Sequence, residues 1–196
     1  MFPRVRIFGQ NATDRGIKVP DGPDWLHEIK YSAGERSRPP DYPRGGYTWA
    51  DRFPSIVEAA RRNRHKQLVV DGEAVVLGVD GIADFNALHS RRHDDEVQLY
   101  AFDIMALDGD DLRGLSLSMR KIKLARLLAR CPDGIFAAEY EHGEIGPDLF
   151  EAACRIGLEG LVSKRADRPY RAGRSKDWIK VKNRKHPAYR RVQDWC

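Results

Sequence analysis

Two lysines near the end of the sequence have the residue type and the spacing needed to bind an anion. Residues 178–182 (WIKVK) alternate apolar and charged side chains, which is typical of a β-strand with one polar face. Lys180 and Lys182 then share that face about 7 Å apart, as neighbours two positions along a strand do. Like charges held in this way repel each other unless an anion, such as a nucleotide phosphate, lies between or above them. The alternative is a solvated strand edge on which lysines prevent aggregation.

Two carboxylates lie in otherwise apolar stretches. Glu159 begins residues 159–164 (EGLVSK), which end in Lys164. Mg²⁺ usually takes one or two carboxylates together with phosphate oxygens of a substrate, so Glu159 is a candidate ligand, although it is also an ordinary polar strand end. Glu73 lies inside the apolar residues 68–77, where an unpaired charge is costly. A ribose hydroxyl, a metal ion or a structural arginine would satisfy it.

A third lysine has the surroundings of a nucleophile. Residues 25–31 (WLHEIKY) place Glu28 and Lys30 on one face of a strand that is otherwise suited to burial. Desolvation and neighbouring cations favour the neutral, nucleophilic amine of a lysine in such a position. A simple ion pair on a half-exposed strand explains the pattern equally well. Tyr100 and Phe102 also share a strand face, where an aromatic ring either stacks on a base or packs in the core.

The elements that must position these residues follow from periodicity and turn signals. Strands outnumber helices and mix irregularly with them, which predicts an α+β fold with mainly antiparallel sheets and flanking helices. Ser118 is expected to cap the clearest amphipathic helix, with its apolar side formed by Met119, Ile122, Leu124, Leu127 and Leu128. Strands are expected at residues 25–31, 67–78, 97–107, 135–140, 158–164 and 178–182, and further helices at 54–64, 84–89 and 147–156.

Other segments are predicted to lack regular structure. Residues 1–22 read as an irregular leader, residues 32–46 as a loop rich in proline and glycine, and residues 188–196 as a basic tail. One domain is therefore expected at residues 23–187.

The charge of the chain is unevenly distributed. The 196 residues carry a formal net charge of +5, but residues 161–196 alone hold 12 basic and 3 acidic side chains, which favours an anionic partner. Cys131, Cys154 and Cys196 have no metal-ligand spacing, and no apolar run approaches a membrane span. With 41% apolar and 32% charged residues, the composition excludes a membrane protein and a disordered tail, and we expect a reduced cytoplasmic protein.

Taken in order, these segments resemble the adenylation domain of ATP-dependent DNA ligases, within the covalent nucleotidyltransferases, and most closely the ligase domain of bacterial end-joining ligases. The resemblance implies the nucleotidyltransferase (ATP-grasp-like ligase adenylation) fold without an OB-fold, ATP and Mg²⁺ as cofactors, and nicked double-stranded DNA as partner. It is carried by residues 25–30, 71–73 (DGE), 100–103 (YAFD), 159–164 and 178–182.

The resemblance also implies a role for each candidate residue. Lys30 would attack the α-phosphate of ATP, hold AMP as a lysyl-AMP intermediate and pass it to the 5′-phosphate of a DNA nick, as in repair or recombination. The remaining roles concern the nucleotide and the metal. Glu28 would contact the adenine amino group, Glu73 the ribose or the metal, Phe102 a face of the base, Arg44 the substrate side and Glu159 Mg²⁺, while Lys164, Lys180 and Lys182 would neutralise phosphate charge.

Two departures from the family pattern predict reduced activity. The family has Lys-x-Asp-Gly at its nucleophilic lysine, whereas Ser32 and Ala33 stand here in place of the aspartate and the glycine. The sequence also ends soon after the paired lysines, so we expect an OB-fold or end-joining protein to be supplied separately. A catalytically inactive remnant that binds nucleotide or DNA is therefore an alternative. An RNA ligase or a capping-type nucleotidyltransferase, which uses the same chemistry, is another.

Overall fold

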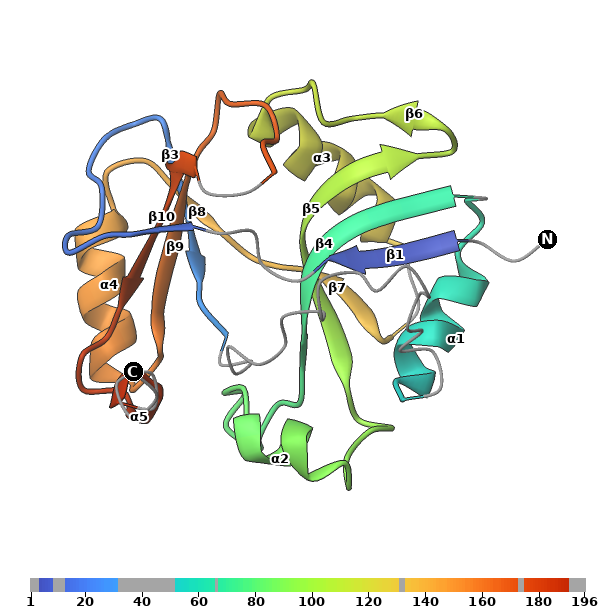
Figure 1. Ribbon diagram of the computed structural model, residues 1–196, viewed down its shortest axis with the longest axis horizontal. Coiled ribbons are helices and arrows are strands. Elements are labelled where there is room, and N and C mark those ends of the chain that lie inside the picture. Colours follow the sequence, from blue (N-terminus) through green and yellow to red (C-terminus); the bar gives the residue numbers. More distant parts are fainter. Residues whose placement is uncertain are drawn as a thin grey trace.

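The computed structural model describes residues 4–8, 13–31, 52–65, 67–130, 133–172 and 175–190. These residues form two five-stranded sheets, each with at least one helix packed on its outer side (Figure 1). Most strand pairs are antiparallel, including β4 with β5 and β9 with both β3 and β10. The predicted α+β fold with mainly antiparallel sheets and flanking helices is therefore confirmed. Among the described residues, no helix combines the length and apolar character needed to cross a membrane.

The first sheet has the strand order β1-β4-β5-β6, and β7 pairs with β5. Its core lies between the sheet and two helices, where Leu68, Leu99, Ile104 and Leu124 are buried. This burial of apolar side chains stabilises the sheet and fixes the helices on one of its sides. The elements are β1 (Arg4–Phe8), β4 (Gln67–Val75), β5 (Gln98–Leu107), β6 (Asp110–Asp111), β7 (Ile135–Ala137), α1 (Pro54–Arg62) and α3 (Leu117–Leu128).

The second sheet has the strand order β2-β10-β9-β3-β8. Val19, Ala153, Leu161 and Val181 form a separate small core beneath α4. Two cores on two outer sides leave the other sides of the sheets available for polar residues. The elements are β2 (Thr13–Arg15), β3 (Trp25–Ile29), β8 (Glu141–His142), α4 (Gly146–Arg155), β9 (Gly160–Arg165) and β10 (Ser175–Lys182), with the short helices α2 (Phe85–Ser90) and α5 (Pro187–Arg190) outside the two sheets.

The N-terminal segment is not an irregular leader, and this prediction was wrong. Strand β1 pairs in parallel with β4, and β2 pairs in parallel with β10. The alternation of arginine and apolar residues over Arg4–Phe8 has the period of two that is typical of a strand, and the edge of β4 provides the partner. Composition alone concealed this, because glycine and proline surround both short strands.

The helix α3 begins two residues earlier than predicted and buries a different side. Ser116, not Ser118, is the N-cap, and its hydroxyl accepts a hydrogen bond from the Met119 backbone N–H. Met119 and Ile122 are exposed on this helix. The buried residues are Leu117, Arg120, Lys121, Leu124 and Leu128, so two cations replace the expected apolar side chains.

A glycine at the start of β9 is required by its backbone conformation and by its neighbours. Gly160 has φ +148°, and a Cβ atom there would collide with the backbone carbonyl of Val181. Both strain and overlap oppose a side chain, so we expect Gly160→Ala to lower the free energy of unfolding by about 3 kcal/mol. Urea unfolding followed by circular dichroism measures this loss.

Gly143 is the matched control. It also has a positive φ, +98°, but no atom lies within 4 Å of an added Cβ. Gly143→Ala therefore meets only the conformational cost, about 1 kcal/mol. Equal losses for the two variants would contradict the close approach at Gly160.

Candidate active site

Strand register gathers the charged residues of the second sheet on one side. Glu28 on β3 and Lys180 on β10 both pair with Val162 on β9. Since alternate residues of a strand point to the same side, Lys164 on β9 and Lys182 on β10 lie on this side as well. The opposite side holds the apolar residues that pack against α4. The alternation of side chains along each strand thus places charged residues from separate motifs on the same side of the sheet.

Lys30 directly follows β3 and lies in contact with Glu159. Its side chain is only 1% exposed, and its Nζ is 2.5 Å from Glu159 Oε2. The Nζ also donates a hydrogen bond to the Tyr31 backbone carbonyl, at 3.1 Å. Lys182 Nζ is 3.4 Å from Glu159 Oε1, so one carboxylate lies between two ammonium groups. A buried amine held beside a carboxylate and a second cation is an arrangement suited to nucleophilic attack on an anionic phosphate.

The surroundings of Glu159 determine its charge. Burial alone would raise the pKa of this carboxyl group, but the ammonium groups of Lys30, Lys182 and Lys180 lower it below its ordinary value. Glu159 therefore stays an ionised hydrogen-bond acceptor. Lys180 is half-buried and acts on this carboxylate through its charge.

Glu28 lies between two other cations. Lys164 donates a hydrogen bond to Glu28 Oε2 at 2.6 Å, and Lys121 of α3 forms an ion pair with Oε1. Glu28 is buried, and burial would raise its pKa, but Lys121 and Lys164 together hold the pKa below its ordinary value. The two contacts connect β3 to β9 and to α3 of the first sheet.

Lys164 also lies against two aromatic rings. Its Nζ is 4.0 Å from the centroid of the Phe102 ring and 4.6 Å from that of Trp178. Phe102 belongs to β5 of the first sheet and Trp178 to β10 of the second, so this ammonium group lies where the sheets meet. Cation–π attraction stabilises a desolvated ammonium group in such a position.

Strand β4 of the first sheet adds Asp71 and Glu73, which share one side of the strand. Asp71 is fully buried, and burial raises its pKa well above the ordinary value; Lys164 opposes this shift, and Asp103, Glu28 and Glu73 add to it. Glu28 and Glu73 thus both act through their charges on the same carboxyl group, that of Asp71. Glu73 was predicted from the sequence to be a site residue, whereas Asp71 was not.

Two tyrosines continue the site beyond Lys30. The rings of Tyr31 and Tyr100 lie 5.0 Å apart, and Tyr100 stacks on Phe136 at 5.6 Å. Burial, followed by Tyr100 and the carboxylates of Glu139, Glu28 and Glu73, raises the pKa of Tyr31 to about 12. Tyr31 therefore stays a neutral hydroxyl at physiological pH.

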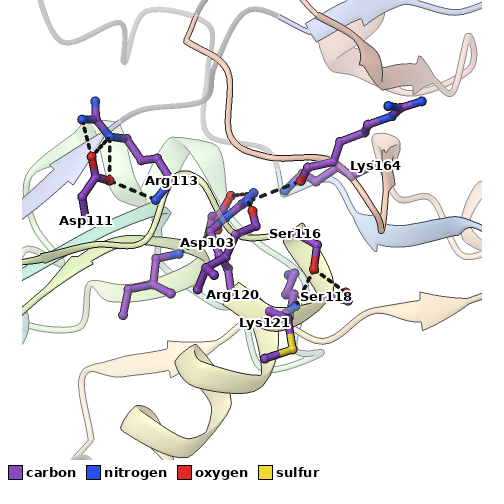
Figure 2. A network of polar contacts seen from close by, with 12 residues as sticks. Asp103, Asp111, Arg113, Ser116, Ser118, Arg120, Lys121 and Lys164 are labelled. Atoms are coloured by element: carbon purple, nitrogen blue, oxygen red, sulfur yellow. Dashed lines mark hydrogen bonds and ion pairs between the residues drawn. The ribbon is translucent and has the colours of Figure 1, made fainter.

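Sequence reasoning missed Arg120 and Lys121 of α3. Arg120 is fully buried and forms two hydrogen bonds with Asp103, from Nε to Oδ1 at 2.7 Å and from Nη2 to Oδ2 at 2.9 Å. Figure 2 shows this pair beside the first turn of α3. The spacing from Leu117 to Leu124 contained the signal, because positions three and four after Leu117 must face the same way as Leu124.

The predicted site residues differ in where the structure places them. The contacts above form two sets: Lys30 and Lys182 contact Glu159, and Lys164 contacts Glu28 and Phe102. Lys180 acts on Glu159 through its charge, and Glu73 acts in this way on Asp71 and Tyr31. Arg44 and the altered segment at residues 32–46 lie outside the described residues. No group of three or more histidine, cysteine, aspartate or glutamate side chains within the described parts of the chain is arranged to hold a metal ion.

Comparison with solved structures identifies the class of this fold. The ligase domain from Mycobacterium tuberculosis LigD superposes with a TM-score of 0.66 at 26% identity, over 91% of this chain and 60% of that one. A mycobacterial DNA ligase D complexed with ATP and MES superposes with a TM-score of 0.60 at 28% identity, again over 91% and 60%. The two sheets are thus those of a ligase nucleotidyltransferase domain.

Comparison with sequences identifies the family. Residues 22–182 match the model of the ATP dependent DNA ligase domain. The multifunctional non-homologous end joining protein LigD of Pseudomonas aeruginosa is 32% identical over 176 residues, covering 85% of this chain and 21% of that protein. The chain belongs to the ATP-dependent DNA ligase domain family, an enzyme family, and the resemblance inferred from the five motifs is confirmed. The chain spans about a fifth of the length of this curated relative.

Proposed function

We propose that this chain is the adenylation domain of an end-joining ATP-dependent DNA ligase and forms a lysyl-AMP intermediate on Lys30. The observation that supports this most directly is the buried Lys30 amine, 2.5 Å from the Glu159 carboxylate. Lysine is rarely buried so completely unless it is paired, since removing an ammonium group from water is unfavourable, and Lys30 is paired with a carboxylate of another family motif.

The first step joins Lys30 to AMP. The Lys30 ammonium group loses a proton to water, and the neutral Nζ, held beside the ionised Glu159 carboxylate, then attacks the α-phosphorus of ATP. The N–P bond forms as the bond to the pyrophosphate oxygen breaks, and pyrophosphate leaves. Lys180 and Lys182, on the same side of β10, stabilise the negative charge that develops on the leaving group.

The nucleoside contacts other residues of the same site. Glu28 accepts a hydrogen bond from the adenine amino group, the Phe102 ring contacts the base, and Glu73 contacts the ribose. The burial of these three side chains supports these roles, because recognition by hydrogen bonds and stacking is strongest where water is excluded.

Two carboxylates of the described residues are candidate ligands for Mg²⁺. Glu159 is the carboxylate nearest to the reacting amine, with Glu73 as the second candidate on the first sheet. One carboxylate fits the usual chemistry of Mg²⁺ in nucleotide sites, where water and phosphate oxygens supply most ligands. Mg²⁺ bound there would neutralise phosphate charge.

Nick sealing follows the first step. The 5′-phosphate of a nick takes AMP from Lys30, and a 3′-hydroxyl then displaces AMP. The family of the chain supports a DNA substrate. The name of its relative, a non-homologous end joining protein, supports a role in DNA repair. Other parts of a ligase, such as an OB-fold, act with this domain during sealing.

The test is covalent labelling. The chain is incubated with ATP labelled at the α-phosphate and Mg²⁺, and denaturing electrophoresis shows whether label stays on the protein. A labelled band that acid releases and hydroxide preserves, as for a phosphoramidate, is expected. No band at saturating ATP would leave only a remnant that binds nucleotide or DNA. Parallel reactions with nicked DNA, nicked RNA and GTP separate the DNA ligase from RNA ligase and capping activities.

The basic residues 161–196 predict a salt-dependent affinity for DNA. Each phosphate neutralised contributes about −0.9 to the slope of log K against log salt, so about four contacts lower the affinity roughly 100-fold between 50 and 200 mM salt. Fluorescence anisotropy with a labelled nicked duplex measures the slope. A flat salt response would contradict an electrostatic DNA interface.

Exposed residues allow a matched comparison. Replacing Lys176, Arg184 and Lys185, which are exposed in the C-terminal third, with alanine should reduce the slope. Replacing Arg126 and Arg130 with alanine, which are exposed at the end of α3, should not. Equal effects of the two sets would show that the C-terminal charge has no particular role.

A further inference from the structure

Lys121 is a buried cation that the proposed reaction does not use. It extends from α3, is 3% exposed, and forms an ion pair with Glu28 on β3 of the other sheet. The Tyr140 ring lies 4.9 Å from its Nζ. Lysine is almost never fully buried without a specific partner, so the contact with Glu28 accounts for its position.

The partner of Lys121 is the carboxylate that is proposed to contact the base. Lys121 contacts Glu28 Oε1, and Lys164 contacts Oε2 at 2.6 Å. A carboxylate with a cation on each oxygen remains ionised and can only accept hydrogen bonds. About four lone-pair positions exist on the two oxygens, so room remains for a further donor.

This charge state distinguishes adenine from guanine. At the same ring position, adenine carries an amino group that donates, whereas guanine carries a carbonyl oxygen that accepts. An ionised Glu28 attracts the amino group and repels the carbonyl oxygen. A protonated Glu28 could instead donate to guanine, so the preference depends on the charge of this one carboxylate.

We propose that Lys121 is a positioning residue that holds Glu28 ionised and oriented, and thereby makes the site select adenine nucleotides over guanine nucleotides. The inference rests on the proposed function, in which Glu28 contacts the base. Lys164 is less able to do this alone, because its ammonium group also lies against Phe102 and Trp178, and the family resemblance implies that it neutralises phosphate charge. Lys121 contacts Glu28 from the side of α3, and although the Tyr140 ring also lies near its Nζ, the proposed reaction gives it no role at the phosphates.

Lys121→Met is the primary variant, with Lys121→Arg and Lys123→Met as controls. Equilibrium dissociation constants for ATP and GTP are measured by calorimetry with each folded protein. The ratio of the GTP constant to the ATP constant is expected to fall at least about tenfold in Lys121→Met, since a base-reading hydrogen bond to a charged group is weakened. Lys121→Arg keeps a cation beside Glu28 and should keep most of the preference. Lys123 is half-buried on the same helix, and its substitution should leave the ratio unchanged.

A double-variant comparison separates positioning from mere structure. Glu28→Gln alone should lose the preference, because an amide both donates and accepts. Adding Lys121→Met to Glu28→Gln should then change the ratio no further. Equal losses of ATP and GTP affinity in Lys121→Met, or an unchanged ratio, would overturn the proposal. If Lys121→Met does not fold, Lys121→Gln and Glu28→Gln give the same comparison.

The pH dependence provides an independent readout. Glu28 is faced by Lys121 from α3, Lys164 from β9, Asp71 from β4 and Tyr31 beyond the end of β3. Without Lys121, burial raises the pKa of Glu28 with only Lys164 opposing it, so the preference for ATP should weaken as pH falls from 8 to 6. The unmodified chain should show no such trend over this range. A matching trend in both proteins would contradict the role of Lys121.

The outcomes distinguish this inference from the proposed function. A chain that prefers ATP in a Lys121-dependent way but forms no covalent adduct supports the inference and overturns the proposed chemistry. A chain that forms the adduct and keeps its preference for ATP in Lys121→Met supports the proposed chemistry and overturns the inference about Lys121. A chain that binds neither nucleotide overturns both.

Discussion

Lys30→Ala is expected to abolish covalent labelling by ATP, lowering the rate of adduct formation by at least about 1,000-fold. The loss follows from the proposed chemistry, because the substitution removes the Nζ atom that forms the bond to phosphorus. Radiolabelled protein measured after denaturing electrophoresis gives the rate. Binding of ATP itself should persist at a reduced affinity, since the other nucleotide contacts remain.

Two controls separate lost chemistry from a lost fold. Lys30→Arg keeps a cation near Glu159, but a guanidinium group cannot be deprotonated in a protein, so it should remain folded and unlabelled. Lys18→Ala removes an exposed lysine and should label normally. Undiminished labelling of Lys30→Ala would place the adduct on another residue and refute the assignment.

Short-range features of the site could be predicted from the sequence. Strand periodicity alone indicates that Glu28 and Lys30 share a side and that Lys180 and Lys182 share a side, since alternation is a property of the strand itself. The contact between Lys30 and Glu159 could not be obtained in this way. It depends on the pairing of β3 with β9, which the residues of either strand do not encode separately. The order of the motifs supplied this information only through the family resemblance.

The charged residues of α3 show a different limit. Apolar periodicity assumes that buried positions are apolar, so it assigned Met119 and Ile122 to the buried side. The structure buries Arg120 and Lys121 instead, because Asp103 and Glu28 provide partners from strands of two different sheets. A buried cation is favourable only where such partners are present, and the helix sequence does not show whether they are. Patterns in a single helix therefore could not reveal it.

Buried cations of α3 and β9 link the two sheets. Lys121 links α3 to β3, and Lys164 links β9 to the Phe102 ring on β5. Arg120 adds a third link, since its Nη1 donates to the backbone carbonyls of Leu115 and of Arg168, the latter following β9. Such pairs contribute little net stability but are costly to break, because a single buried charge would remain. The geometry of the site therefore depends on keeping every pair complete.

Arg120→Met is the stability prediction with the largest expected effect. Both members of the Arg120–Asp103 pair are 0% exposed, and removal of the guanidinium group leaves the Asp103 carboxylate buried without its cation. Breaking a buried pair in this way costs about 3 to 5 kcal/mol, and we expect that decrease in the free energy of unfolding. Urea unfolding at pH 7 measures it.

The pair Arg113–Asp111 is the matched control. It is also bidentate, with Nη2 2.7 Å from Oδ2 and Nε 2.9 Å from Oδ1, and it lies in the same region (Figure 2). Because both of its side chains are more than half exposed, Arg113→Met should unfold at nearly the same urea concentration as the unmodified chain. The double variant Arg120→Met with Asp103→Asn should recover part of the loss, because no charge is then left unpaired. The single variant Asp103→Asn completes the comparison. If the double variant loses as much free energy of unfolding as the two single variants lose in sum, packing and not the buried charge accounts for the effect.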